Sequence, residues 1–258
     1  GRSTRPEATP AQAAGATVPR LEFVSSRFCG LAGLDPGGGG RLLLFPPTGG
    51  LVLFTGERTG GDAPGCVGTL AFQPAAGGGL TVRCRGPLLH FPDTSPFLDL
   101  EPGLETARLV EGDVALDLVP DHTPHERAVF GSVTGRVTLD GTAHAIAGHG
   151  FADDRPPSPV WPRLRAAFRL ASDASVVLTV GLDGTHADGW VRRDARHDAV
   201  VGATVDVGPY ATERGLRLDL ELASGERLTV AVHAMHRLPV LRTRGPTPGR
   251  FELRACGL

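Results

Sequence analysis

Lysine and asparagine are absent from the 258 residues, and methionine and tyrosine each occur only once. All 26 basic residues counted as Lys+Arg are therefore arginines. They nearly balance 28 acidic residues, and no run of five like charges occurs. The missing lysine excludes Schiff-base catalysis, and the missing asparagine excludes N-linked glycosylation. Charge this evenly spread argues against nucleic acid or an acidic membrane as partner and favours a neutral or apolar one.

Paired-cysteine motifs and long apolar runs are also missing. Cys29, Cys66, Cys84 and Cys256 show no CxxC spacing, so free thiols are favoured over disulfides or a metal site. The first twenty residues contain no hydrophobic leader, and no apolar run reaches the length of a membrane span. We therefore expect a cytoplasmic protein without membrane insertion.

Nucleotide and serine-hydrolase signatures are absent. The glycines at 37–40 and the Gly148-His149-Gly150 segment do not lead from a strand into a helix, and no GK[ST] follows them. No GxSxG elbow occurs, and Ser132 fits a strand residue better than a nucleophile. We therefore expect no cofactor.

What the sequence does contain is a long series of short alternating apolar runs separated by turn residues. Residues 1 to 20 are small, polar and proline-punctuated, which predicts a disordered tail. Hairpin turns are predicted at Asp140-Gly141, Asp183-Gly184 and Ser224-Gly225. The one possible helix is a short one around Pro162 to Arg169. Strands are expected at LEFV, RLLLF, LVLFT, TLAF, LTVR, VALDLV, AAFRL, SVVLTVGL, GWVRR, AVVGATVDV, LRLDLEL, ERLTVAVHAM and FELRA.

This pattern predicts an all-β fold with little helix, in sandwiches or barrels rather than βαβ units. The strands are too many for one small barrel, and an eight-stranded barrel is about the size that holds one small ligand. We therefore expect two consecutive antiparallel barrel-like domains, one over residues 21–121 and one over 122–258.

Two HxxH pairs, His122 with His125 and His233 with His236, have the spacing of helical metal ligands. Pro124 argues against a helix at the first pair, and an extended backbone turns positions i and i+3 to opposite sides. We therefore expect no metal at either pair.

The candidate chemistry lies between His122 and Trp161. If the two runs around Asp140-Gly141 pair as a hairpin, His149 lies opposite Ser132 and Asp153 opposite Ala128, which places Asp153 near His125 and Glu126 at one rim. A histidine and a carboxylate at the mouth of an apolar cavity can exchange protons with a ligand. The same residues also fit an ordinary solvated turn, because Asp153 and Asp154 precede an arginine and two prolines.

The segment from His125 to Asp154, HERAVFGSVTGRVTLDGTAHAIAGHGFADD, resembles the centre of the double-lipocalin proteins related to carotenoid 1,2-hydratase and the AttH group. In that superfamily a histidine leads into G-x-V-x-G-x-V, a turn and then G-x-G-x-x-D. These motifs stand here at His125, 131–137 and 148–153, and a second, weaker match covers 188–194. The resemblance implies two consecutive lipocalin-like barrels with a ligand cavity, and it implies acid–base roles for His125 and Asp153.

By this resemblance the leading hypothesis is a cofactor-independent cyclase of secondary metabolism, which folds an apolar polyene polyketide or terpenoid intermediate for a [4+2] cycloaddition. An acid–base hydratase or isomerase of a polyene double bond, and a non-catalytic carrier of an apolar metabolite, remain as alternatives. The family usually has a Trp-Gly pair soon after the aspartate, where this chain has 155–161 (RPPSPVW), and this departure disfavours hydration. Beside the catalytic candidates, the side chains expected to line a substrate site are His149, Trp161, Trp190 and Tyr210.

Overall fold

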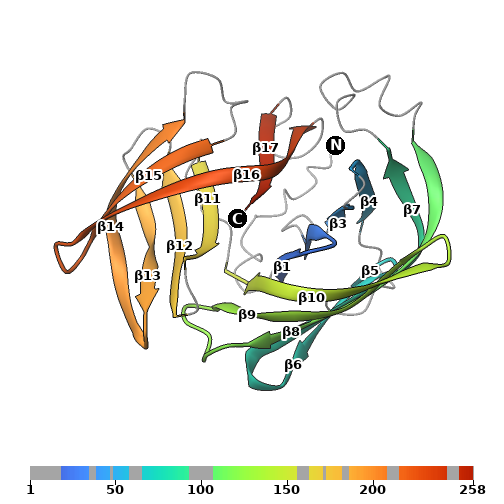
Figure 1. Ribbon diagram of the computed structural model, residues 1–258, viewed down its shortest axis with the longest axis horizontal. Helices are drawn as coiled ribbons and strands as arrows, with labels where there is room; N and C mark the ends of the chain where they lie inside the picture. Colours follow the sequence, from blue (N-terminus) through green and yellow to red (C-terminus); the bar gives the residue numbers. More distant parts are fainter. Residues whose placement is uncertain are drawn as a thin grey trace, which may run out of the picture.

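The computed structural model describes residues 19–34, 39–46, 49–57, 66–92, 107–155, 163–170, 173–181, 186–207, 215–242 and 250–257, without the side chains of 163–165, 207, 215–216 and 232–257. The predicted all-β class is confirmed, because the described residues form two antiparallel sheets and no α-helix. The two sheets follow one another along the chain and lie side by side (Figure 1).

The first sheet closes into an eight-stranded barrel. Its order is β4-β3-β2-β1-β10-β9-β8-β7, and β7 returns to pair with β4. The small strands β5 and β6 extend the sheet beside β7. The strands are β1 (Arg20–Ser25), β2 (Cys29–Leu34), β3 (Gly39–Phe45), β4 (Leu51–Glu57), β5 (Cys66–Val67), β6 (Leu70–Ala75), β7 (Gly79–Phe91), β8 (Arg108–Pro120), β9 (Ala128–Leu139) and β10 (Thr142–Asp153).

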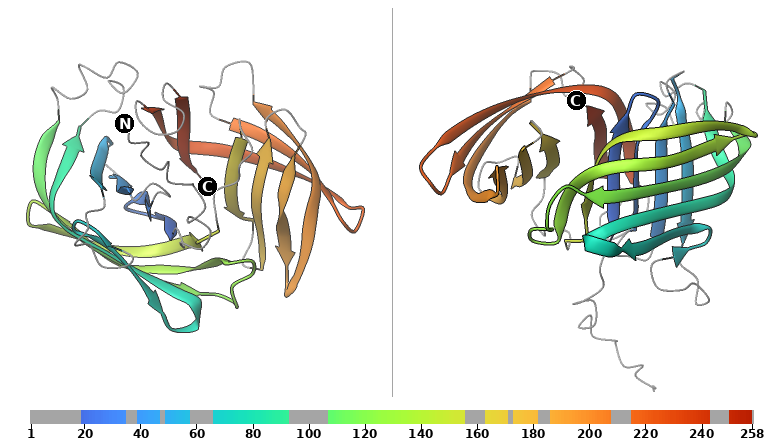
Figure 2. Two further views of the ribbon diagram at one scale, coloured as in Figure 1. Left: turned by 180° about the vertical axis from the view of Figure 1, so that it is seen from behind. Right: turned by 60° about the horizontal axis from the view of Figure 1, so that its bottom comes forward.

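The second sheet is a seven-stranded meander that curls without closing among the described residues (Figure 2). Its strands pair in chain order: β11 (Arg163–Arg169), β12 (Ala174–Gly181), β13 (Ala187–Arg193), β14 (Arg196–Val207), β15 (Gly215–Leu222), β16 (Arg227–Arg242) and β17 (Arg250–Gly257). The short helix expected around Pro162 to Arg169 is wrong, because residues 163–169 are the edge strand β11. Pairing with β12 outweighs the weak local preference for helix.

The division between the sheets does not fall at residue 121. Strands β9 and β10 belong to the first barrel, where β10 pairs with β1 and so completes the ring. A division at residue 121 would leave both β1 and β8 with an unpaired edge, which sheets avoid. The second sheet starts at Arg163. The predicted tail is covered only in part: residues 1–18 lie outside the described residues, and β1 begins at Arg20.

The predicted register of the central hairpin is confirmed. Asp153 lies opposite Ala128 and His149 opposite Ser132 in the β9–β10 pair. Asp140 and Gly141 have φ values of 47° and 79°, the left-handed backbone of the tight turn that their residue types favour. Gly225, with φ 87°, forms the turn expected between β15 and β16. The turn expected at Asp183-Gly184 lies outside the described residues.

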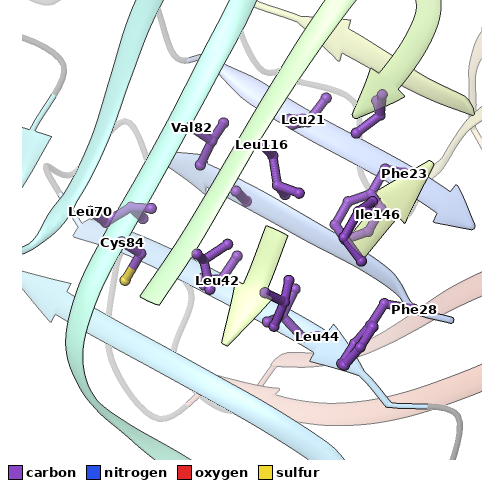
Figure 3. Close-up of a cluster of buried hydrophobic side chains, with 14 of the residues drawn as sticks. Leu21, Phe23, Phe28, Leu42, Leu44, Leu70, Val82, Cys84, Leu116 and Ile146 are labelled. Atoms are coloured by element: carbon purple, nitrogen blue, oxygen red, sulfur yellow. The ribbon is translucent and has the colours of Figure 1, made fainter. Parts of the chain in front are cut away.

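Apolar side chains fill the inside of the barrel. Leu21, Phe23, Leu42, Leu116 and Ile146 point inward from four different strands and are at most 3% exposed (Figure 3). Because side chains alternate along a strand, the polar residues between them point outward. Functional groups on this barrel are therefore on its outer face.

Among the described cysteines, Cys66 and Cys84 are free thiols, as predicted. Burial raises the pKa of the Cys84 thiol to about 11. Among the described residues no helix is long and apolar enough to cross a membrane.

Candidate functional site

The outer face of β9 and β10 packs against the outward face of β11 to β13. Phe130 and Phe151 from the barrel share one buried cluster with Val177 and Trp190 from the second sheet. The Phe130 ring lies 4.9 Å from that of Phe151 and 6.4 Å from the Trp190 indole, between ring centroids. The two sheets therefore meet at an aromatic wall, and we call this contact the interface.

A tight turn brings a histidine to the edge of this wall. His125 and Ala128 exchange two backbone hydrogen bonds of 2.9 Å, and the two residues between them, Glu126 and Arg127, have φ values of 47° and 65°. Glu126 is exposed at the tip of the turn. His125 packs edge-on against Trp190, at 5.5 Å between ring centroids.

Three imidazoles gather beside Trp190, and with it they form what we call the histidine cluster. The His125 ring stacks on that of His197 at 3.8 Å and 13°. His122 lies 6.5 Å from His197, and Trp190 lies 5.0 Å from His197 at right angles. His197 comes from β14, so the cluster joins the segment before β9 to the second sheet.

The predicted separation of His122 from His125 is therefore wrong. Residues 121–124 bend rather than continue a strand, so both rings approach His197. Near-parallel stacking brings ring faces together rather than nitrogen lone pairs, which is unlike metal coordination. Within the described part of the chain, no three His, Cys, Asp or Glu residues are placed to hold a metal ion. The side chains of His233 and His236 lie outside the description.

Burial and neighbouring basic groups lower the pKa of two rings of the cluster, His122 and His197. Burial, then His125, Arg192 and His122, lower the pKa of His197 to about 4. The pKa of His122 is also lowered, first by burial and then by Arg192, with Asp121 acting in the opposite direction. At neutral pH both rings are therefore neutral, and each carries one donor and one acceptor nitrogen.

Several buried polar atoms of the cluster have no hydrogen-bond partner among the described residues. They are both ring nitrogens of His122, Nε2 of His197 and Nε1 of Trp190. Buried donors and acceptors are nearly always paired in folded proteins, because leaving one unpaired costs about 1 to 3 kcal/mol. Four such atoms beside one aromatic wall are available for hydrogen bonds to a ligand or to water.

A further ion pair lies across the interface. Arg169 on β11 donates to Asp121 at 2.8 Å and to Nδ1 of His149 at 3.0 Å. His149 points outward from β10, because its neighbours on either side alternate into the barrel. It therefore contacts the second sheet instead of lining the barrel interior.

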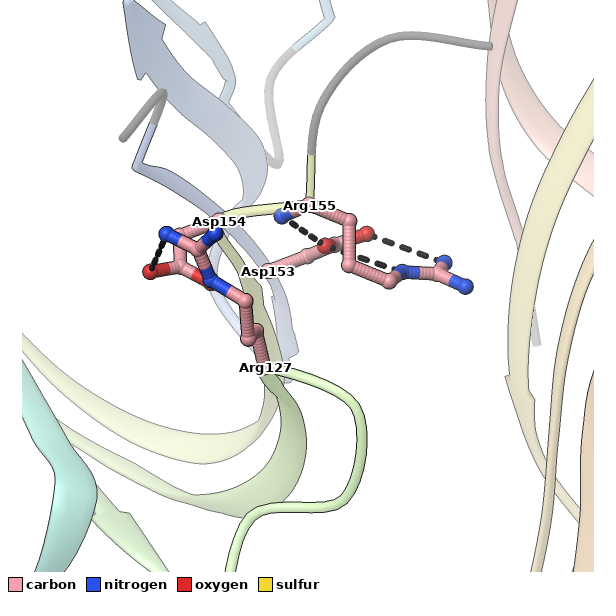
Figure 4. A network of polar contacts seen from close by, with 4 residues as sticks. All are labelled: Arg127, Asp153, Asp154 and Arg155. Carbon is pink, nitrogen blue, oxygen red and sulfur yellow. Dashed lines mark hydrogen bonds and ion pairs between the residues drawn. The ribbon is translucent and has the colours of Figure 1, made fainter. Parts of the chain in front are cut away.

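Asp153 lies at the rim but is held by its own chain. Its side chain is fully buried, and it accepts three hydrogen bonds from Arg155: one from the backbone N–H at 2.8 Å and two from the guanidinium at 3.2 Å (Figure 4). Asp154 pairs instead with Arg127 at 2.9 Å. A guanidinium this close stabilises the carboxylate form, so Asp153 is poorly suited to donate a proton.

Of the predicted site residues, the structure brings His125, His149 and Trp190 to the interface and leaves Glu126 in solvent. Trp161 and Tyr210 lie outside the described residues. Sequence reasoning missed His197 and Arg192. The turn at 194–195 between two strand-like runs was the signal available for them, because it places Arg192 directly opposite His197.

The sequence was also compared with known proteins. No family model and no curated protein matches this chain. Functional assignment therefore depends on the site itself.

Proposed function

We propose that this chain is a cofactor-independent cyclase that folds an apolar polyene polyketide or terpenoid intermediate for ring formation of the [4+2] type. The observation that carries the proposal is a set of buried hydrogen-bonding atoms on His122, His197 and Trp190 that lie beside an aromatic wall and have no partner among the described residues. An apolar chain with one polar group, such as a carbonyl, matches both parts of this site: its apolar part suits the aromatic wall, and its oxygen accepts a hydrogen bond from a ring N–H.

The chemistry asked of such a site is modest. Holding a flexible chain in a near-reactive geometry can supply several kcal/mol of the barrier, of the order of 7 to 11 in the best intramolecular cases. A neutral imidazole or indole N–H that donates to the substrate carbonyl lowers the lowest unoccupied orbital of the conjugated alkene. The same hydrogen bond stabilises the charge that develops on the carbonyl oxygen in the transition state. Phe130, Phe151 and Trp190 form a rigid apolar wall beside these donors.

The family resemblance supports the same reading. It is carried by the motif segment from His125 to Asp154, and the all-β architecture with one closed barrel and a second curled sheet agrees with a pair of lipocalin-like domains. We propose that relationship together with the activity.

Two alternative functions make different demands on the site. A hydratase or isomerase needs a proton donor, and the arginine-bound Asp153 is a poor one, so proton transfer would fall to the stacked His125 and His197. A non-catalytic carrier needs the same aromatic wall and no reactive geometry.

The deciding experiment incubates the purified chain with synthetic linear trienes that bear a terminal enone, and follows ring formation by liquid chromatography and mass spectrometry. We expect faster cyclisation than in buffer, a loss of about tenfold or more in His197→Phe, and no loss in the control His186→Gln, which lies outside the cluster. Tight binding of the triene without acceleration would identify a carrier instead.

Proton transfer is separated from shape-driven cyclisation by D₂O and by two further variants. A cyclase of the proposed kind incorporates no solvent deuterium and, assayed at a temperature at which circular dichroism shows both variants folded, retains most activity in Asp153→Asn and in His125→Gln. Deuterium in the product together with loss of activity in His125→Gln would instead establish the hydratase or isomerase.

A further inference from the structure

One face of the second sheet carries a row of polar side chains at the interface. Arg169 on β11 lies opposite Ser175 on β12, Ser175 opposite Arg192 on β13, and Arg192 opposite His197 on β14. Directly opposed residues in neighbouring strands point to the same face of a sheet. The row therefore runs alongside Trp190, which lies two residues before Arg192 on the same strand and face.

Charge along this row is not balanced. Arg169 is neutralised by Asp121, at 2.8 Å. Arg192 is half-buried, and within the described part of the chain it has no ion pair. It is close enough to the cluster to affect the ionisation of both His122 and His197. With those two rings neutral, Arg192 is a positive charge without an ion-pair partner among the described residues of the interface.

Two buried donors flank Arg192 and have no partner in the part of the chain that the structure describes. Ser175 is 3% exposed and Trp190 is 1% exposed, yet Oγ of the one and Nε1 of the other make no hydrogen bond to any described residue. A guanidinium, a hydroxyl and an indole N–H share a need for acceptor oxygens. Partly buried cations are normally paired, because desolvation otherwise penalises them.

We propose that Arg192, with Ser175 and Trp190, binds an anionic oxygen group, so that the substrate is an apolar chain ending in a carboxylate or an acidic enol. That the bound molecule is a substrate rests on the proposed function, whereas the anion site itself is tested by binding alone. Arginine suits such a group because its fork donates two parallel hydrogen bonds to a carboxylate.

The test uses decanoate, at concentrations below its micelle threshold, against the uncharged decanamide of the same chain length. In Trp161→Phe, Trp190 is the only tryptophan left, so its fluorescence reports binding at the site. We expect decanoate to bind about tenfold or more tightly than decanamide, with a preference that weakens at high salt.

Arg192→Gln in this background should remove the preference for decanoate, and Ser175→Ala should reduce it. Arg193→Gln is the matched control, since Arg193 is the next residue along β13, where alternation turns it to the other face, and it pairs with Glu226 at 2.6 Å. Arg192→Lys keeps the positive charge and should retain part of the preference, which guards against a folding defect in Arg192→Gln.

Equal affinity for the two probes, no binding of decanoate, or equal effects of Arg192→Gln and Arg193→Gln would each overturn the anion site. The cyclisation assay is independent of this outcome. Discrimination by Arg192 without cyclisation would leave an anion-binding carrier, whereas cyclisation without discrimination would leave the cyclase and remove the anion site.

Discussion

At the scale of single residues, identical side chains have different roles here because their surroundings differ. Asp153 and Asp154 are adjacent, yet the first is fully buried against Arg155 and the second is partly exposed against Arg127. Coulombic attraction is weakly screened in the first pair and strongly screened in the second. The sequence DDR contains no sign of this difference.

Asp153→Asn should destabilise the fold much more than Asp154→Asn. Removing one partner of a buried pair leaves the other charge uncompensated, and we expect a loss of about 2 to 4 kcal/mol in the free energy of unfolding. An exposed pair contributes less than about 1 kcal/mol. Urea denaturation of both variants measures the two values, and similar losses would contradict the assigned burial.

The thiols differ in the same way. Burial raises the pKa of Cys84 to about 11, whereas Cys66 is half-buried. Because the thiolate is the reactive form, iodoacetamide at pH 8 should modify Cys66 well before Cys84. Peptide mapping follows each site separately. Faster labelling of Cys84 in the folded protein would show that its strand opens readily.

At the scale of elements, the β9–β10 hairpin is the part of the fold that could be predicted from the sequence. Its turn residues and strict alternation fix the register, and the observed partners of His149 and Asp153 are those predicted. Strand β2 was not predicted, since its sequence CGLAGL is rich in small residues with little strand preference. Its pairing with β1 and β3 supplies what local preference lacks.

Glycine in this hairpin is required by packing. A Cβ added at Gly150 would lie 2.3 Å from Val133 Cγ2 and 2.9 Å from the Glu22 carbonyl, whereas one at Gly33 meets nothing closer than 3.7 Å. Gly150→Ala should therefore cost about 1 to 3 kcal/mol, and Gly33→Ala should be close to neutral. Thermal and urea unfolding check the pair. Equal stability of the two variants would mean that the side chains around Gly150 shift enough to accept the added methyl group.

At the scale of the whole molecule, the candidate site belongs to neither sheet alone. Sequence reasoning placed His125 and Asp153 at one rim correctly, but it could not place His197 or Arg192 beside them. Local patterns fix which face of a strand a residue occupies, whereas the docking of two outer faces depends on their shapes. Such long-range contacts have no periodic signature in the chain.

The histidine cluster should make stability sensitive to acid. An unfolded histidine titrates near pH 6.5, and the pKa of His197 in the folded chain is about 4. Between these values the unfolded chain binds a proton that the folded chain does not, so stability falls as the pH falls from 6.5 toward 4. Below that range the loss is complete and no longer grows.

Thermal melts at several pH values between 7.5 and 4.5 measure this fall. His197→Gln should show a shallower decline in Tm than the wild type, with His186→Gln as control. The same decline in all three proteins would mean that His197 does not carry the effect.

The closure of the barrel by β1 and β10 also has a consequence for biosynthesis. The first strand of the barrel to leave the ribosome pairs early with β2 but finds its second partner, β10, only when that last strand emerges, and until then the free edge of β1 and the growing edge of the sheet both remain open to other chains. A nascent chain that stops before residue 142 cannot form the ring at all. We therefore expect prematurely terminated chains to aggregate, and slow translation through β9 and β10 to demand chaperone protection.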